Sequence, residues 1–243
     1  LALAVHAAEV PLCYAVSTGQ TAPGFALKDL GGTMHDLSQM KKSPMVVLYF
    51  FDAASRPSQE GLLSLDQIAK KYKGAQLTVW GITRSTKAQA VDFAAKTKPS
   101  FPILHDMAGV SDQYNAKTIL PTVCIIGPEL KVMDVFQGGG KTMSIMLTRV
   151  AERKLQQKDT AMALAISDEA ARKGPDNDQA VAVKGYAALK AGKASEAEQT
   201  FAKLAKGKGK AEILGKEGLA AVYARQGKAD KALTLASEVE KKA

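Results

Sequence analysis

Residues 45–60 read MVVLYFFDAASRPSQE, and this stretch decides the fold of the first part of the chain. Its first seven residues, 45–51, form an unbroken apolar run of strand length. Such runs are typical of strands that helices cover on both faces of a sheet. Residues 62–72 follow with apolar side chains at a spacing that puts one helical face inward. A buried strand followed by an amphipathic helix predicts an α/β fold.

The alternation of strands and helices continues on both sides of this stretch. Paired glycines at 31 and 32 favour a hairpin between 25–27 and 33–35, because glycine supplies the positive φ angles of a tight turn. The patterns predict further strands at 77–82, 101–104, 122–126 and 131–136, and helices at 87–96, 110–114 and 141–157.

The composition changes near residue 140. Prolines become rare after it, and Ala, Lys, Glu, Gln and Leu dominate. This change predicts an α/β domain followed by an all-helical one.

The helical part contains an internal repeat. Gly192 and Gly227 lie 35 residues apart in similar surroundings, and Ala197 and Phe201 follow at the small and aromatic positions. A period near 34 residues is typical of tetratricopeptide repeats. We therefore expect a tetratricopeptide-like domain over residues 151–243, whose concave face would hold a peptide or another protein. The alternative is a helical bundle that only pads the first domain.

Five phrases in a fixed order carry a family resemblance. They are residues 19–27 (GQTAPGFAL), 29–33 (DLGGT), 46–51 (VVLYFF), 120–122 (LPT) and 127–129 (GPE). In this order the chain resembles the periplasmic thiol-disulfide oxidoreductases of the TlpA-like and ResA-like class, within the thioredoxin superfamily and of AhpC/TSA type. The resemblance implies a thioredoxin-like domain over residues 16–150, with a central mixed sheet flanked by helices.

The resemblance also implies a degenerate active site. In that class the first long strand leads to Cys-x-x-Cys at the start of a helix, whereas here the matching residues are Ser55-Arg56-Pro57-Ser58. Pro57 fixes the alignment, so Ser55 and Ser58 occupy the two cysteine positions. Disulfide exchange needs a thiolate and a resolving thiol, and a serine hydroxyl can replace neither. Ser55 is expected instead to cap the helix.

Two further features agree with a loss of catalysis. The ResA-like relatives hold a buried acid after the second long strand, and Arg84 occupies approximately that position here. The histidines, at 6, 35 and 105, lie in other segments than Ser55, so no Ser-His pair is evident. We therefore expect no catalytic residue at this site and lean against an enzyme.

Pro121 remains from the family pattern. In the superfamily the equivalent proline is cis and exposes backbone that pairs with an extended substrate. The resemblance implies that this edge still holds a peptide by strand addition. The candidate peptide-binding residues are Ala54, Ser55, Ile119, Leu120 and Pro121. The alternative is that Pro121 only shapes a turn of the core.

The chain contains two cysteines, Cys13 and Cys124. In an exported protein a disulfide between them is possible and would be worth about 2–4 kcal/mol. Sequence cannot show whether they are close enough, so the bridge and two separate thiols both stay open.

The chain starts with LALAVHAAE, which looks like the end of an export signal. An apolar run that closes on a small-x-small pattern at Val5, His6 and Ala7 is how such a signal meets its peptidase. We therefore expect residues 1–15 to be a signal remnant and N-terminal extension, and the protein to be exported to the periplasm or cell surface. An ordinary N-terminal strand or helix is the alternative.

The distribution of charge limits the classes of partner that the sequence predicts. The net charge is +9, but lysines concentrate only within residues 203–210, where no aromatic side chain stands between them. Single-strand binding uses stacked rings beside the charge, so nucleic acid is not expected. Residues 138–142 read GGGKT but lack the upstream glycine of a phosphate loop. No metal or cofactor motif is evident either, nor a transmembrane segment.

Three functions remain. The first is a redox-inactive module that binds or assembles another protein in the periplasm or at the cell surface. The second is a thiol-disulfide oxidoreductase or peroxidase-like enzyme that uses Cys124 or Cys13. The third is a structural subunit of a surface assembly, which would associate with itself.

Overall fold

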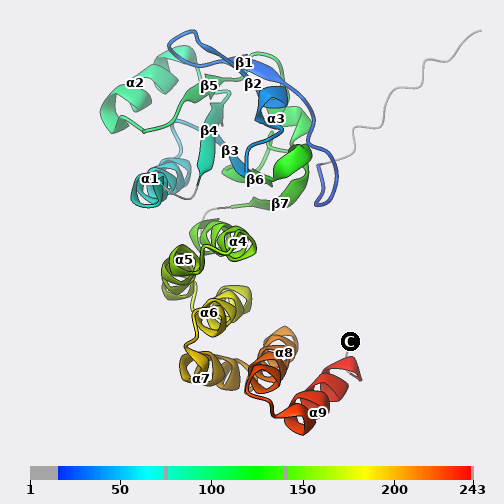
Figure 1. Ribbon diagram of the computed structural model, residues 1–243. Helices are drawn as coiled ribbons and strands as arrows, with labels where there is room; N and C mark the ends of the chain where they lie inside the picture. The colour runs from blue at the N-terminus through cyan, green and yellow to red at the C-terminus, as the bar shows by residue number, and fades with distance from the viewer. Residues whose placement is uncertain (1–15, 74–75, 139–141, 242–243) are drawn as a thin grey trace, which may run out of the picture. The chain divides into compact units, whose positions relative to one another are not determined.

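The computed structural model describes residues 16–73, 76–138 and 142–241 (Figure 1). Contacts divide the chain into two compact units. The sheet unit comprises the described residues up to Gln59 together with Thr78–Gln137. The helical unit comprises Glu60–Leu77 and the residues from 138 on.

A mixed five-stranded sheet forms the centre of the sheet unit, with the strand order β5-β4-β3-β6-β7. Its strands are β3 (Met45–Phe51), β4 (Leu77–Thr83), β5 (Ile103–His105), β6 (Thr122–Ile126) and β7 (Val132–Gln137). β4 and β5 are parallel, whereas β6 is antiparallel to both β3 and β7. All seven residues of β3 are buried, which confirms the prediction from the apolar run.

Short elements complete the sheet unit. They are the antiparallel hairpin β1 (Ala26–Lys28) and β2 (Met34–Asp36), the helices α2 (Lys87–Thr97) and α3 (Val110–Gln113), and the 3-10 helices Leu37–Met40 and Pro128–Leu130. The predicted glycine turn is present, with Gly32 at a φ of +94°. The core beneath the hairpin contains Leu48, Phe50, Trp80 and Tyr114.

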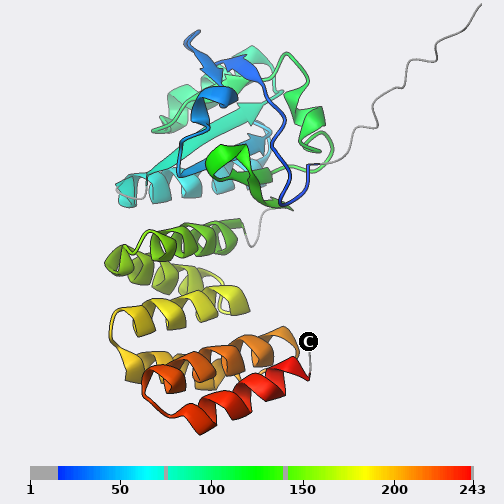
Figure 2. The same ribbon diagram turned by 45° about the vertical axis from the view of Figure 1, so that its right-hand side comes forward.

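The helical unit continues the chain with α4 (Thr142–Gln156), α5 (Thr160–Lys173), α6 (Asp178–Lys190), α7 (Ala194–Leu204), α8 (Lys210–Arg225) and α9 (Ala229–Glu240). From α4 on, each helix packs against the next, and α6 also contacts α4 and α8 (Figure 2). The prediction of an α/β domain followed by a purely helical part is therefore confirmed.

Close packing in the helical unit depends on glycines inside helices. The Phe201 ring is fully buried and stacks edge-on against Tyr186, with ring centroids 4.9 Å apart. A Cβ atom at Gly185 would lie 2.6 Å from this ring, and one at Gly218 would lie 2.0 Å from it. Phe201 thus fits against α6 and α8 only because both positions lack a side chain.

The helix after β3 starts directly after Ser55, the expected cap, and is longer than its apolar spacing alone predicted. α1 spans Arg56–Lys71, whereas the apolar spacing begins only at residue 62. Its first turn is mostly polar and therefore carries no hydrophobic period. The units also divide the chain differently from the predicted domains 16–150 and 151–243. α4 belongs to the helical unit because it packs along α5 and α6, and Glu60–Leu77 belongs to it as well.

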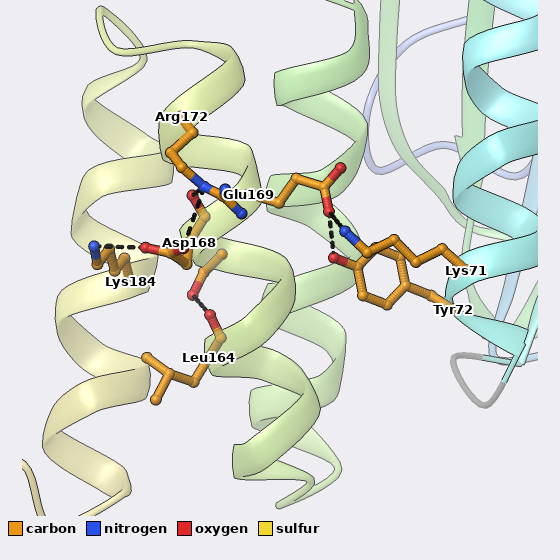
Figure 3. A network of polar contacts seen from close by, with 8 residues as sticks. Lys71, Tyr72, Leu164, Asp168, Glu169, Arg172 and Lys184 are labelled. Carbon is orange, nitrogen blue, oxygen red and sulfur yellow. Dashed lines mark hydrogen bonds and ion pairs between the residues drawn. The ribbon is translucent and has the colours of Figure 1, made fainter.

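A polar network joins α1 to α5 within the helical unit (Figure 3). Glu169 on α5 accepts hydrogen bonds from the ammonium of Lys71 and from the hydroxyl of Tyr72, the latter at 2.5 Å. Next to it, Asp168 pairs with Lys184 at 2.7 Å and with Arg172 at 3.3 Å. Burial opposes ionisation of Glu169, but the bonds from Lys71 and Tyr72 prevail and lower its pKa.

Replacing this carboxylate should weaken the helical unit in a pH-dependent way. Because the pKa of Glu169 is lowered on folding, its stabilisation is present above the ordinary value of 4.5 and is lost as the pH falls through the folded-state pKa. We expect Glu169→Gln to lose about 1–2 kcal/mol of unfolding free energy at pH 7 and less at pH 3. Urea unfolding followed by circular dichroism at both pH values measures this. Glu240→Gln, an exposed change on α9, should leave both values unchanged.

Candidate functional site

The loop between β3 and α1 is held by two polar side chains. Asp52 accepts hydrogen bonds at its Oδ1 from the amide of Ala54 at 2.9 Å and from the hydroxyl of Ser85 at 3.1 Å. The Ser85 oxygen in turn accepts from the amide of Ala53 at 2.9 Å and from the hydroxyl of Thr83 at 3.0 Å. The loop is therefore fixed to the end of β4, which fits a surface prepared for a ligand.

Ser55 and Ser58 occupy the start of α1. The carbonyl of Ser55 accepts the first helical hydrogen bond, from the amide of Gln59 at 3.0 Å, which places Ser55 at the N-cap. Ser55 is half-buried and Ser58 is fully buried. The Ser58 carbonyl accepts from the hydroxyl of Tyr49 at 3.0 Å, but its own hydroxyl has no hydrogen-bond partner among the described residues.

Removing the Ser58 hydroxyl should therefore not destabilise the sheet unit. A buried hydroxyl without a partner carries a desolvation cost, so we expect Ser58→Ala to raise the unfolding free energy by about 1 kcal/mol. Ser111 is the matched control, because it is also buried and its hydroxyl donates to Asp106 at 2.6 Å. Ser111→Ala should cost about 1–3 kcal/mol. Fluorescence of Trp80, the single tryptophan, follows both unfolding transitions, and equal losses in the two variants would contradict the expectation.

The Leu120-Pro121 peptide bond is cis. β3 pairs with β6 so that Phe50 lies opposite Thr122, which brings Pro121 beside the last residue of β3 and the start of the loop. Ile119 is 49% exposed, and its carbonyl accepts a hydrogen bond from the Thr122 hydroxyl at 2.5 Å. The geometry thus leaves an apolar side chain at the surface next to the cis proline.

A small pocket of about 220 Å³ opens at this end of the sheet. Its lining residues are Phe50, Phe51, Ile82, Arg84, Ser111, Ala116, Lys117 and Leu120. Of the five predicted peptide-binding residues, all within the described chain, only Leu120 contributes to the lining. Arg84 pairs with Asp112 at 2.8 Å at the surface, and Lys117 approaches the same carboxylate at 3.9 Å.

The described histidines make structural contacts. Nε2 of His35 lies 2.9 Å from Asp29, and its ring stands edge-on to Trp80. Nε2 of His105 donates to the carbonyl of Ser85 at 3.0 Å, since a carbonyl can only accept. Within the described ranges neither imidazole is hydrogen-bonded to Ser55 or Ser58, so neither serine has a base of the Ser-His kind.

Cys124 lies in the core of the sheet unit. Burial, with a smaller contribution from Asp134, raises the pKa of its thiol to about 12, so it is protonated at neutral pH. Cys13 and the predicted signal remnant at residues 1–15 lie outside the described residues, and the bridge between the two cysteines stays a prediction.

Sequence reasoning missed Asp52 and Ser85, which position the loop. A signal existed for Asp52, since an aspartate directly after a strand often accepts from the backbone two residues on. Ser85 carried none, because its contact crosses 32 positions of sequence. No group of three or more His, Cys, Asp or Glu side chains suited to a metal occurs in the described part of the chain, and no helix there is long and apolar enough to span a membrane.

Comparison with known proteins shows which family and which proteins the chain is similar to. The AhpC/TSA family model matches residues 18–135. The thioredoxin-like protein YneN of Bacillus subtilis is 28% identical over 126 residues, which cover 51% of this chain and 73% of YneN. The chloroplastic peroxiredoxin Q of Sedum lineare is 35% identical over 92 residues, covering 37% of this chain and 49% of that protein.

A solved structure shares the fold. The peroxidoxin BcpB of Mycobacterium tuberculosis is 24% identical, with a TM-score of 0.50, and the match covers 57% of this chain and 96% of BcpB. The residues that the AhpC/TSA family model matches, 18–135, include the cis proline and the strand-to-helix loop at Ser55. The sheet unit therefore has a thioredoxin-like fold, and its sequence is similar to that of AhpC/TSA proteins.

Proposed function

We propose that the protein is a redox-inactive binding module, in which the former dithiol site holds a polypeptide without exchanging thiols. The observation that carries the proposal is oxygen in place of sulfur at both Ser55 and Ser58, in a loop that Asp52 and Ser85 keep rigid. A hydroxyl cannot form a sulfur-sulfur bond, whereas a preformed loop still favours binding.

The surroundings of the loop suit an extended peptide. Ile119 presents an exposed apolar side chain beside the cis proline, and the pocket lined by Phe51 and Leu120 offers an apolar floor. An extended segment could pair with the backbone near Pro121 and place one side chain in this pocket. Ala54 and Ser55 would then form the opposite side of the site.

The helical unit would provide a second surface for a protein. Its consecutive helices and the glycines that admit Phe201 fit the tetratricopeptide-like interpretation of the sequence. Such arrays bind peptides or partner proteins on their concave face. We place the protein in the periplasm or at the cell surface on the signal-like pattern of residues 1–9, and we assign it no cofactor.

A thiol enzyme is the second candidate, because some relatives carry the name peroxiredoxin. It would have to use Cys124 or Cys13. Cys124 is buried and protonated at neutral pH, which disfavours it as a nucleophile. A structural subunit is the third candidate, and it would reveal itself as self-association during size-exclusion chromatography.

Peptide selection on the purified protein tests the binding proposal. Peptides selected by phage display on the full chain would be measured against variants by fluorescence anisotropy. We expect Ile119→Asp to weaken the selected peptides about tenfold or more, because it places a charge on the apolar contact. Val91→Asp on α2 is the matched control, since Val91 is 44% exposed and Ile119 is 49% exposed. Equal binding to the wild type and to Ile119→Asp would refute a site at this edge.

A further inference from the structure

A second and larger cavity, of about 460 Å³, lies on the sheet unit away from the loop at Ser55. The hairpin β1–β2 forms one wall, through Lys28, Leu30 and Met34. The other wall consists of the end of β5, the residues that follow it, and the start of α2. It contributes His105, Met107 and Lys87. The two walls are fixed to each other, because the amide of Leu30 donates to the carbonyl of Ile103 at 3.0 Å.

Two methionines give this cavity an exposed apolar lining. Met34 is 55% exposed and Met107 is 81% exposed. Six large hydrophobic side chains in the described ranges are exposed to solvent, and Met34 and Met107 are two of these six. Both line this cavity. Methionine is flexible and polarisable, and exposed methionines are favoured on surfaces that adapt to a partner. Covering both side chains would bury apolar area that water now contacts.

The charge of the cavity is positive. Lys28 and Lys87 both line it, and neither has an ion-pair partner among the described residues. Asp29 also lines it, but this carboxylate is engaged by His35 at 2.9 Å and by the amide of Thr33 at 2.9 Å. Two free ammonium groups attract a carboxylate and repel a metal cation, although thioethers and an imidazole are present.

His105 is a fixed part of the wall. Its Nε2 donates to the Ser85 carbonyl at 3.0 Å, which holds the ring in place. The pocket near Leu120 differs, because the cations there already share the carboxylate of Asp112.

We propose that this cavity is a docking site for an acidic segment of a partner protein. The segment would place a large apolar side chain against Met34 and Met107 and its carboxylates against Lys28 and Lys87. This inference does not depend on the site at Ser55, because the two sites share no lining residue.

Nuclear magnetic resonance of the full chain, labelled with ¹³C at the methionine methyl groups, tests the proposal. Met34→Leu and Met107→Leu assign the two signals. The probe is a short peptide of alternating Glu and Leu. We expect it to shift both signals, and we expect Lys28→Glu with Lys87→Glu to weaken its binding about tenfold or more. Lys208→Glu, at an exposed lysine of the helical unit, should have no effect.

Three results would overturn this assignment. One is the absence of any shift at Met34 and Met107 with the Glu-Leu peptide. Another is an equal shift with the matched Lys-Leu peptide, which would remove the role of charge. The third is an equal shift with octanoate at the same concentration, which would make the cavity a site for small organic acids and not for a protein segment.

Discussion

A variant that carries Ser55→Cys and Ser58→Cys should gain thiol-disulfide chemistry at a site where the wild type carries two hydroxyl groups. Position 55 is the N-cap of α1 and position 58 is its third residue. A side chain at the N-cap of a helix reaches toward the third residue. Ser55 is half-buried and Ser58 is fully buried, so an accessible attacking thiol and a protected resolving thiol would result. The helix N-terminus lowers the pKa of a thiol placed there. We expect insulin reduction with dithiothreitol to be at least about tenfold faster than with the wild type.

The single variants control this experiment. Ser55→Cys alone can attack a disulfide but cannot resolve the mixed disulfide, and Ser58→Cys alone is buried. Both single variants should reduce insulin at about the rate measured without protein. Of the three variants, only the double variant should form a disulfide between positions 55 and 58 on oxidation. A double variant that folds, as judged by Trp80 fluorescence, yet forms no disulfide would show that the loop lacks the dithiol geometry.

Gly218→Ala should strongly destabilise the helical unit. Its new Cβ would lie 2.0 Å from the Phe201 ring, and that ring is fully buried and also packs closely against Gly185. Alanine favours a helix over glycine by about 1 kcal/mol, yet overpacking of this severity should outweigh that gain. We expect a net loss of about 3 kcal/mol in unfolding free energy, measured by urea unfolding with circular dichroism.

Two comparisons separate overpacking from a general effect of alanine. Gly24→Ala in the sheet unit should be harmless, because a Cβ there meets nothing within 4 Å. Phe201→Ala should cost about 3–5 kcal/mol on its own. Combined with Gly218→Ala it should cost clearly less than the sum, since the clash disappears with the ring. Strict additivity would mean that Gly218 and Phe201 do not meet as described.

The strands were predictable because their signal is local. The apolar run 45–51 became β3 without a shift of boundary, and residues 122–126 became β6 in the same way. The first turn of α1 was not predictable from periodicity, since Arg56, Ser58 and Gln59 give no apolar stripe. The packing of the helices could not be predicted from the sequence for a different reason. Gly185 and Gly218 are unfavourable for helix formation, and only the structure shows that both make room for the Phe201 ring.

The residues of the candidate site could be predicted from the sequence, but the contacts between them could not. The resemblance placed Ser55 and Ser58 at the two cysteine positions and left open whether Pro121 is cis, and the structure has that proline in the cis form. The anchoring of the loop by Ser85 could not be predicted, because it joins the ends of two strands that are neighbours only in the fold. The cavity of Met34 and Met107 was missed for the same reason, since its walls come from β2 and from the chain after β5.

We propose that this protein, whose sheet unit has a thioredoxin-like fold, does not exchange thiols. The most direct measurement is the turnover of the purified wild type in two assays, insulin reduction with dithiothreitol and consumption of hydrogen peroxide, with Cys124→Ser and Cys13→Ser measured beside it. We predict rates equal to those without protein for all three proteins, because Ser55 and Ser58 carry no sulfur and the Cys124 thiol is buried. Turnover by the wild type that either cysteine variant abolishes would contradict the claim.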